Sequence, residues 1–388
     1  MSEEKKKVFN FSKLKEIGQM DIKDLTKGLK VKKVDVKIPV KREKSRNVIS
    51  FDIGASSIKM VTGKYSREKL VINKCIDIIT PDGVINDGRI VNQDTLKDII
   101  KFSLNENKIK AQDVIITTNS SLVINREIVI PKVEADEIDT VIRYEIQQYL
   151  PINLDDYILQ FIILEELEDE SGQKLKVNVI AYPDKIARGY YDLINSLGLT
   201  PYVLDVTYNS INKIANYSEL SKVGDKGTVA FVDMGGNSVN VTVLKDGKLD
   251  FTRMIKIGGD NIDFALSQKL NMSVKSTESI KIEKGKLLDI KDDDVINNAL
   301  KICIDEIVMD LERIIKFYSN KSVGNKIDKI FVYGGTSNIK GIDNYLEEKF
   351  DIKTEKIDKL NNIEFASKEL KELSMEQYLN AIGAIIRL

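Results

Sequence analysis

The sequence predicts an α/β fold of two similar lobes, chiefly because one short motif occurs twice. FDIGASSIKM begins at Phe51, and FVDMGGNSVN begins at Phe231. In both stretches an apolar run ends in Asp, an apolar residue and Gly, and small polar residues follow. Repetition of this kind indicates two copies of one structural unit. The hydrophobic pattern around the two copies is the second observation, because it predicts the same elements in the same order.

Three strands joined by turns are expected around each copy, followed by a helix. The first helix is expected at 92–109, with Asn92 or Asp94 as its N-terminal cap. The second is expected at 298–320, where apolar residues recur on one stripe. The six expected strands lie at 47–54, 57–66 and 68–80 for the first copy, and at 228–235, 238–247 and 248–259 for the second.

Composition excludes several classes of function. The chain has 388 residues, 42% of them hydrophobic and 31% charged, and a net charge of −1 at pH 7. These values are typical of a globular protein and give no reason to expect nucleic acid as a partner. The chain contains no histidine, which excludes Ser-His and Cys-His nucleophile pairs. Cys75 and Cys303 are isolated in the sequence, so neither a disulfide framework nor a zinc site is expected, and a reducing cytoplasm is favoured. No apolar run is long enough for a membrane span or a secretory signal.

The repeated motif has the residues of a phosphate-binding turn. A glycine just after a strand lets the backbone approach an anion closely, so successive N–H groups of the turn can donate to phosphate oxygens. Asp52 and Asp233, at the ends of the two first strands, are expected to hold a hydrated Mg²⁺ that bridges the phosphates. One such turn occurs in any α/β protein, whereas two in the same context indicate a site. The expected phosphate and nucleotide ligands are Gly54, Ala55, Ser56, Ser57, Lys59, Gly235, Gly236, Asn237, Ser238, Gly258, Gly259, Gly334, Gly335, Thr336 and Ser337.

The order of these turns resembles that of the actin, sugar-kinase and heat-shock-chaperone ATPase superfamily, and within it the FtsA and PilM families. FDIGASSIKMV, the stretch 123–161 and the closing YLNAIGAIIRL are similar to the PilM family of type IV pilus assembly proteins. The resemblance covers 47–388 and implies an actin-like fold with ATP and Mg²⁺ between two lobes. Four residues of the stretch stand at family positions: Arg126, Pro131, Glu145 and Pro151.

The same resemblance implies a small FtsA-type subdomain inserted into the first lobe. The basic segment 1–47 lies outside the range covered by the resemblance and has 15 Lys and Arg against 7 Asp and Glu. Its composition predicts a solvated, disordered tail, and the alternative is a docking arm for an acidic partner or an anionic membrane surface. The expected parts are the first lobe at 48–121 and 173–225, its completing C-terminal helix at 367–388, the inserted subdomain at 122–172, and the second lobe at 226–366.

The resemblance also assigns residues to the binding of the nucleotide base and to catalysis. The acidic helix that lies near the adenosine in the family matches TESIKIEKG, which places Glu278 and Lys281 there. In hydrolytic members an acid or Gln orients the attacking water, and Thr207 stands at that position, with Asp205 two residues earlier. A threonine cannot act as a base at neutral pH. ATP binding is therefore expected, with hydrolysis slow or absent.

The function that the resemblance implies is that of a cytoplasmic assembly protein at the inner-membrane platform of the type IV pilus. Its expected partner is the short cytoplasmic N-terminal segment of a PilN-type membrane protein, contacted by Arg126, Arg143 and Gln147. Pilus motor ATPases, the platform protein and further copies of the chain, as an oligomer or ring, are additional expected partners. Two alternatives remain open: an FtsA-like filament protein of cell division, and a small-molecule kinase of the same superfamily.

Overall fold

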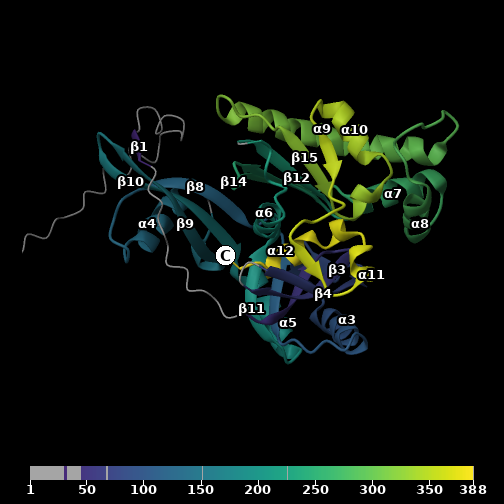
Figure 1. Cartoon of the computed structure of the whole chain (residues 1–388), viewed down its shortest axis with the longest axis horizontal. Helices are drawn as coiled ribbons and strands as arrows, with labels where there is room; N and C mark the ends of the chain where they lie inside the picture. The colour runs from purple at the N-terminus through teal and green to yellow at the C-terminus, as the bar shows by residue number, and fades with distance from the viewer. Residues whose placement is uncertain (1–29, 33–44, 67–68, 151, 225, 388) are drawn as a thin grey trace, which may run out of the picture. The chain divides into compact units, whose positions relative to one another are not determined.

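The structure is a computed structural model that describes residues 30–32, 45–66, 69–150, 152–224 and 226–387 (Figure 1). The chain divides into two compact units, which are described separately. The larger unit contains the described residues of 42–121 and 188–388, and the smaller contains those of 1–41 and 122–187. No helix among the described residues is both long enough and apolar enough to cross a bilayer.

The first sheet of the larger unit has six strands in the order β11-β7-β2-β3-β4-β17. β2, β3 and β4 form an antiparallel meander, while β2 pairs in parallel with β7. The meander expected around the first motif is therefore confirmed. The strands of this sheet are β2 (Asn47–Ile53), β3 (Ser57–Ser66), β4 (Lys69–Ile79), β7 (Asp113–Thr118), β11 (Thr200–Val206) and β17 (Ile363–Phe365).

The second sheet repeats this pattern with five strands in the order β14-β13-β12-β15-β16. β12 pairs antiparallel with β13 and in parallel with β15, and β13 pairs antiparallel with β14. β12 therefore has the neighbours that β2 has in the first sheet, so the predicted α/β fold with two similar lobes is confirmed. The strands are β12 (Thr228–Met234), β13 (Val239–Lys245), β14 (Lys248–Ile255), β15 (Lys329–Tyr333) and β16 (Thr354–Lys356).

Helices complete the larger unit, and both predicted helices are present. α3 (Gln93–Glu106) begins after Asn92, whose side chain accepts from the Thr95 N–H, so Asn92 is the cap. α9 (Val295–Lys321) packs its expected apolar stripe into the core under the second sheet. The remaining elements are α6 (Thr207–Tyr217), α7 (Gly259–Leu270), α8 (Val274–Lys284), η2 (Gly335–Asn338), α10 (Ile342–Phe350), α11 (Lys368–Lys371), η3 (Met375–Gln377), α12 (Leu379–Ile385), and a short β5–β6 hairpin (Ile85–Asn86 and Arg89–Ile90). α5 (Asp184–Ser196) begins in the smaller unit and continues into the larger one at Arg188.

The closing helix α12 is buried along its whole length. Its apolar residues belong to a core shared with β2, β3, α6 and β12. Gly383 allows α12 to approach α6 closely, because a Cβ at this position would collide with the backbone carbonyl of Ser210. The expected single helix over 367–388 is instead three short pieces, α11, η3 and α12. This close packing fixes the position of Asn380, which is important for the site described below.

The smaller unit is a four-stranded antiparallel sheet, in the order β1-β9-β10-β8, with helix α4 (Ile138–Tyr149) packed on one face. Ile138, Ile142 and Ile146 of α4 are buried against alternate residues of the strands, which is the arrangement expected of an amphipathic helix on a sheet. The other elements are β1 (Lys30–Lys32), β8 (Ile124–Pro131), η1 (Leu154–Asp156), β9 (Tyr157–Asp169) and β10 (Gly172–Pro183).

Three features differ from the expected boundaries. β10 continues through 172–183 as one strand paired with both β8 and β9, so the compact unit reaches Ala187, beyond the expected end at 172. β17, within the range expected for the second lobe, pairs in parallel with β4 of the first sheet. In the basic segment, expected to be disordered, Lys30–Lys32 forms β1 against β9, and Asn47 begins β2. Residues 1–29 and 33–44 of that segment, and Pro151, lie outside the described residues.

Candidate functional site

The two copies of the motif form the same turn. The Gly54 N–H donates to the Ser57 carbonyl, and the Gly235 N–H donates to the Ser238 carbonyl, both at 3.0 Å. A Cβ on either glycine would come within about 3 Å of that same carbonyl oxygen, so the turn requires glycine. The pattern of burial is also identical from 52 to 59 and from 233 to 240, with Ser56 and Asn237 exposed at the two tips. The sequence repeat is therefore a repeat of backbone geometry.

The aspartates of the two motifs are held by one side-chain amide. The Nδ2 group of Asn380, in α12, donates to Asp52 Oδ2 at 3.2 Å and to Asp233 Oδ2 at 3.0 Å. On the other side, Asn380 Oδ1 accepts from the Tyr333 hydroxyl at 3.3 Å. The two carboxylates come from the central strands of two different sheets, so this amide links the lobes at the expected metal position.

Both carboxyl groups have raised pKa values. Burial raises the pKa of Asp52 to about 6, against the opposing effects of the Asn380 hydrogen bond and the Lys59 charge. Burial raises the pKa of Asp233 to about 7, the negative charge of Asp52 adds to the rise, and Asn380 again opposes it. Two like charges in a poorly solvated place favour either a proton or a cation between them. Oxygen ligands of this type suit a hard divalent cation.

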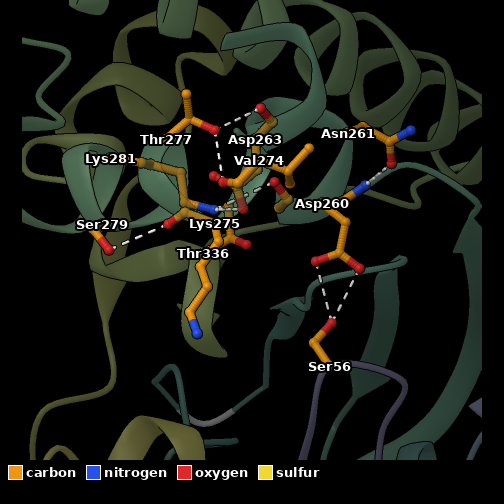
Figure 2. Close-up of polar contacts among 12 residues, drawn as sticks. Ser56, Asp260, Asn261, Asp263, Val274, Lys275, Thr277, Ser279, Lys281 and Thr336 are labelled. Carbon is orange, nitrogen blue, oxygen red and sulfur yellow. Dashed lines mark hydrogen bonds and ion pairs between the residues drawn. The ribbon is translucent and has the colours of Figure 1, made fainter. Parts of the chain in front are cut away.

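The second turn packs against the start of α7. The N–H groups of Gly259 and Asp260 donate to the carbonyls of Gly235 and Gly236, at 3.0 and 2.9 Å. The carboxylate of Asp260 in turn accepts from the Ser56 hydroxyl at 3.2 and 3.1 Å (Figure 2). The tip of the first turn is therefore hydrogen-bonded to α7 of the second lobe, and Ser56, an expected phosphate ligand, already has a partner.

Lys281 lies where α7, α8 and the second turn meet. Its ammonium donates to Asp263 Oδ2 at 2.6 Å and to the Gly259 carbonyl at 3.3 Å (Figure 2). The Thr336 hydroxyl donates to the Gly235 carbonyl at 3.0 Å, which brings η2 to the same place. Asp263 is buried, and its Oδ1 has no hydrogen-bond partner among the described residues. Burial raises its pKa despite Lys281. The structure thus brings together residues of the turns at Gly235, at Gly258–Gly259 and at Gly334–Gly335.

The third turn depends on Gly334. Its φ is +89°, and a Cβ there would lie 2.5 Å from Asp233 Oδ1, so only glycine allows η2 to begin beside this carboxylate. Ser337 is buried, and its hydroxyl donates to the Gly334 carbonyl at 2.7 Å. Ser337 therefore stabilises the turn itself. Glu278, one helical turn from Lys281 on α8, is exposed.

Lys59 and Asn240 occupy equivalent positions in the two motifs, each opposite the motif aspartate in its sheet. The Lys59 ammonium lies 2.7 Å from Asp77 Oδ1 and donates to Gln377 Oε1 at 3.1 Å. Asn240 accepts from the Asn119 amide at 2.8 Å, which is a further polar link between the lobes. Lys59 was expected to contact phosphate, and in the structure it is paired with Asp77 and Gln377.

The expected catalytic positions are both buried. Thr207 is the first residue of α6. Asp205 forms an ion pair of 2.7 Å with Lys213, each side chain being 7% exposed, and accepts from Asn209 at 2.8 Å. Burial alone would raise the pKa of Asp205, but the Lys213 ammonium, together with the Asn209 amide and the Arg387 guanidinium, outweighs burial and holds the pKa below the ordinary range. Asp205 is therefore committed to a buried ion pair, which argues against a role in positioning water.

These residues fit a nucleotide with a bound magnesium ion. The two closely placed carboxylates can hold a hard cation. The N–H groups of the two identical glycine turns, together with a lysine, can donate to phosphate oxygens. No cluster of three or more Cys, Asp or Glu suited to direct metal ligation occurs in the described part of the chain. An ion held by Asp52 and Asp233 through water needs no such cluster.

Sequence reasoning missed Asn380, Asp260, Asp263 and Gln377. Asn380 and Asp263 carry a visible signal, because Asn380 is a polar residue within the apolar run YLNAIGAII and Asp263 stands between Ile262 and Phe264. A polar residue at a position that helical periodicity buries needs a hydrogen-bonding partner. Asp260 and Gln377 each have a polar residue beside them and carry no such signal.

The expected peptide contacts all lie in the smaller unit. Arg126 is on β8, on the same side of that strand as the buried Ile128 and Ile130, which face α4. Arg143 on α4 forms an ion pair of 2.8 Å with Asp139, and Gln147 on the same helix is exposed. The structure therefore places all three residues on the α4 side of the sheet.

Glu145, which the sequence resemblance placed at a family position, lies on α4 and is buried, and burial raises its pKa. Its Oε1 has no hydrogen-bond partner among the described residues. β8 has one hydrogen-bonded neighbour, β10, among the described strands. One edge of β8 is therefore open within that part of the chain.

The fold and the paired turns define a class, namely two-lobed α/β proteins with an actin-like fold. EutJ of Carboxydothermus hydrogenoformans shares this fold, with a TM-score of 0.50 and 13% identity over 96% of this chain and 97% of EutJ. The chain belongs to the family described as type IV pilus assembly protein PilM, whose sequence profile matches residues 50–388.

Two further relatives agree with this family. A solved PilM-PilN type IV pilus biogenesis complex has a chain that superposes with a TM-score of 0.74 and 21% identity, covering 88% of this chain and 99% of that one. Cell division protein FtsA of Bacillus subtilis (strain 168) is 25% identical over 267 residues. That match spans 61% of this chain and 58% of FtsA, which is less than two thirds of the relative's length.

The raised pKa values predict how stability changes with pH. Because the folded-state pKa values of Asp52 and Asp233 lie above the ordinary 3.8, their contribution to stability is complete below about pH 4 and is lost as pH rises through 6 and 7. Asp233→Asn keeps an acceptor for Asn380 and removes the like charge. At pH 8 it should raise the free energy of unfolding of the ligand-free, metal-free protein by about 1 to 2 kcal/mol, after allowance for partial solvation.

Urea unfolding of wild type and Asp233→Asn at pH 5 and pH 8, with a chelator present, measures this effect. The gain should shrink at pH 5, where Asp233 is protonated in the wild type. Asp98→Asn, on the exposed face of α3, is the matched control, and its free energy of unfolding should equal that of the wild type at both pH values. An Asp233→Asn protein that is less stable than wild type at pH 8 would contradict the repulsion between the two carboxylates.

Proposed function

We propose that this chain is a nucleotide-binding assembly protein of the type IV pilus, and that it binds ATP–Mg²⁺ at the paired turns. The observation that carries the proposal is the convergence of Asp52 and Asp233 on one amide, with an identical glycine turn beside each. The packing of a core gives no reason to place two half-buried carboxylates on the same side-chain amide. A cation with attached phosphates neutralises both, and the turn N–H groups provide donors for the phosphate oxygens.

The residues around the turns take separate roles in this proposal. Asp52 and Asp233 hold the hydrated metal, and the N–H groups of the turns hold phosphate. Glu278, Lys281 and Thr336, from α8 and η2, surround the ribose and base. Phosphate binding at the first turn requires Ser56 to exchange its hydrogen bond to Asp260 for one to phosphate. ATP then acts as a ligand that changes how the two turns are joined, which is a means of coupling nucleotide to conformation.

The proposed partner is the cytoplasmic N-terminal peptide of a PilN-type membrane protein. The solved PilM-PilN complex motivates this choice. The open edge of β8 offers backbone groups that an extended peptide can pair with, and alternate side chains of the peptide then meet the α4 side of the sheet. Pro131 at the end of β8 has no N–H and limits that pairing to the preceding residues. Through this partner the chain is recruited from the cytoplasm to the membrane.

Nucleotide binding predicts that ATP–Mg²⁺ stabilises the protein. At roughly 100 times its dissociation constant, a ligand that binds only the folded state adds about 2.7 kcal/mol. Wild type should melt at a higher temperature with ATP–Mg²⁺, and Asp52→Asn and Asp233→Asn should lose most of that shift. Asp233→Asn is thus expected to be the more stable protein without ligand and the less responsive one with it.

Thermal melts at pH 8 with ATP alone, Mg²⁺ alone and both together separate these effects. Asp98→Asn serves again as the control and should keep the full shift. A wild-type melting curve indifferent to ATP–Mg²⁺, or a shift equally large in Asp52→Asn, would rule out the paired turns as the nucleotide site.

Hydrolysis is proposed to be slow or absent. Thr207 cannot act as a base, and Asp205 is held by Lys213. Phosphate release from ATP by the wild type should therefore lie close to the rate without protein, and Thr207→Glu, if folded by circular dichroism, should raise it. Brisk wild-type release that survives Thr207→Ala would show that the catalytic position lies elsewhere.

Peptide binding predicts a loss of affinity on removal of Arg126. Loss of a charge-assisted hydrogen bond costs about 1.5 to 3 kcal/mol, so Arg126→Ala should weaken binding of a PilN-type N-terminal peptide by roughly ten- to a hundredfold. Fluorescence anisotropy with a labelled peptide measures this directly.

Two control variants accompany the titration. Glu127→Ala is on the opposite face of the same strand, where Glu127 pairs with Lys176 at 3.0 Å, and Lys245→Ala is on the second sheet. Both should bind like wild type. If Arg126→Ala retains its fold and binds as tightly as these controls, the peptide site is not on this face of β8.

A further inference from the structure

Helix α9 carries an apolar stripe on the face opposite the core. Val295, Ile302, Met309 and Phe317 are 52%, 63%, 51% and 61% exposed. The first three are seven residues apart, which places them in line along a helix of 27 residues, about 40 Å long. One side of the Phe317 ring packs on Phe251, with ring centroids 5.7 Å apart, and the rest is exposed. Four large apolar side chains in one line are more than scattered exposure explains.

The charges nearest the stripe differ between the two halves of the helix. Asp305 and Glu306 lie on the N-terminal side of Met309, where Lys301 pairs with Asp305. Arg313 and Lys316 lie on the C-terminal side, where they pair with Asp310 and Glu312. Arg313 and Lys316 are 76% and 74% exposed, and their pairs with Asp310 and Glu312 lie within the same helix. Exposed ion pairs of this kind contribute little to the stability of the fold, so their side chains can pair with other charged groups instead.

The pattern is complementary to itself when the helix is reversed. Glu306 and Arg313 are equally distant from the point between Met309 and Asp310, and so are Ile302 and Phe317. A second α9 that runs antiparallel about a twofold axis at this point therefore places Glu306 against Arg313, and Ile302 against Phe317, twice each. A parallel arrangement would instead place like charges against each other. Self-complementarity under a twofold axis is the property of an isologous dimer interface.

We propose that two copies of this chain associate through the exposed face of α9, antiparallel, about a twofold axis near Met309. The apolar residues are buried in the contact, and the separated charges set its direction and register. An interface made mainly by one helix from each copy is small, so the association is weak in solution. This proposal does not depend on the nucleotide or on the peptide.

Charge reversal tests the proposal, because the twofold axis places Glu306 of each copy against Arg313 of the other. Glu306→Arg and Arg313→Glu should each place like charges together and weaken the dimer about tenfold or more. The double variant Glu306→Arg/Arg313→Glu should restore it, since each copy again meets the opposite charge. The two positions are seven residues apart on the helix, too far for a direct pair within one chain. Restoration therefore reports on contact between copies.

Sedimentation equilibrium of the full chain from about 1 to about 200 µM covers the range in which small interfaces dissociate. Thermal melting verifies that every variant is folded, and Lys101→Glu on the exposed face of α3 is the control and should associate like wild type. Wild-type self-association, weakening by each single reversal and recovery in the double variant are the expected results. A wild type that stays monomeric throughout, singles that associate like wild type, or a double variant that stays as weak as the singles would each overturn the proposal.

Discussion

The amide of Asn380 is the interaction on which the geometry of the site depends. Two carboxylates of like charge, from the central strands of two sheets, lie close together because one NH₂ group donates to both. α12 can present that group only because it is buried along its whole length and packs closely on α6 at Gly383. The closeness of the two carboxylates and one of the links between the lobes follow from this contact, whereas burial raises the pKa values of Asp52 and Asp233.

Polar contacts also join the lobes at other places, and these contacts are weaker than a polar contact buried within one lobe. Asn119 and Asn240 form one neutral link, and Ser56 with Asp260 forms another at an exposed turn tip. Exposed hydrogen bonds to a carboxylate exchange readily with water. The buried Asp205–Lys213 pair, in contrast, lies within the first lobe at the start of α6, and breaking it would leave an uncompensated charge. These two polar contacts between the lobes are thus weaker than the buried ion pair within the first lobe.

Much of the fold could be predicted from the sequence because its signals are local. Alternation of apolar residues predicted the strands of both meanders, and Asn92 marked the start of α3 through a contact three residues away. The glycine turns were also predictable, since Gly54 and Gly235 bond within their own turns. Contacts between distant residues were not. Lys59 looks like a phosphate ligand in sequence, yet its partners are Asp77 on the neighbouring strand and Gln377 near the end of the chain. Periodicity carries no information about which polar side chains meet in space.

The position of Asn380 in the chain has a kinetic consequence. It follows Asp52 by 328 residues and Asp233 by 147. During synthesis at roughly 5 to 20 residues per second, it appears roughly 15 to 65 seconds after Asp52. Throughout that interval the strands of both sheets are being made while the group that joins their two carboxylates does not yet exist. The site can therefore form on the ribosome only after the strands that carry both aspartates have been made, although its first motif is made 328 residues before Asn380.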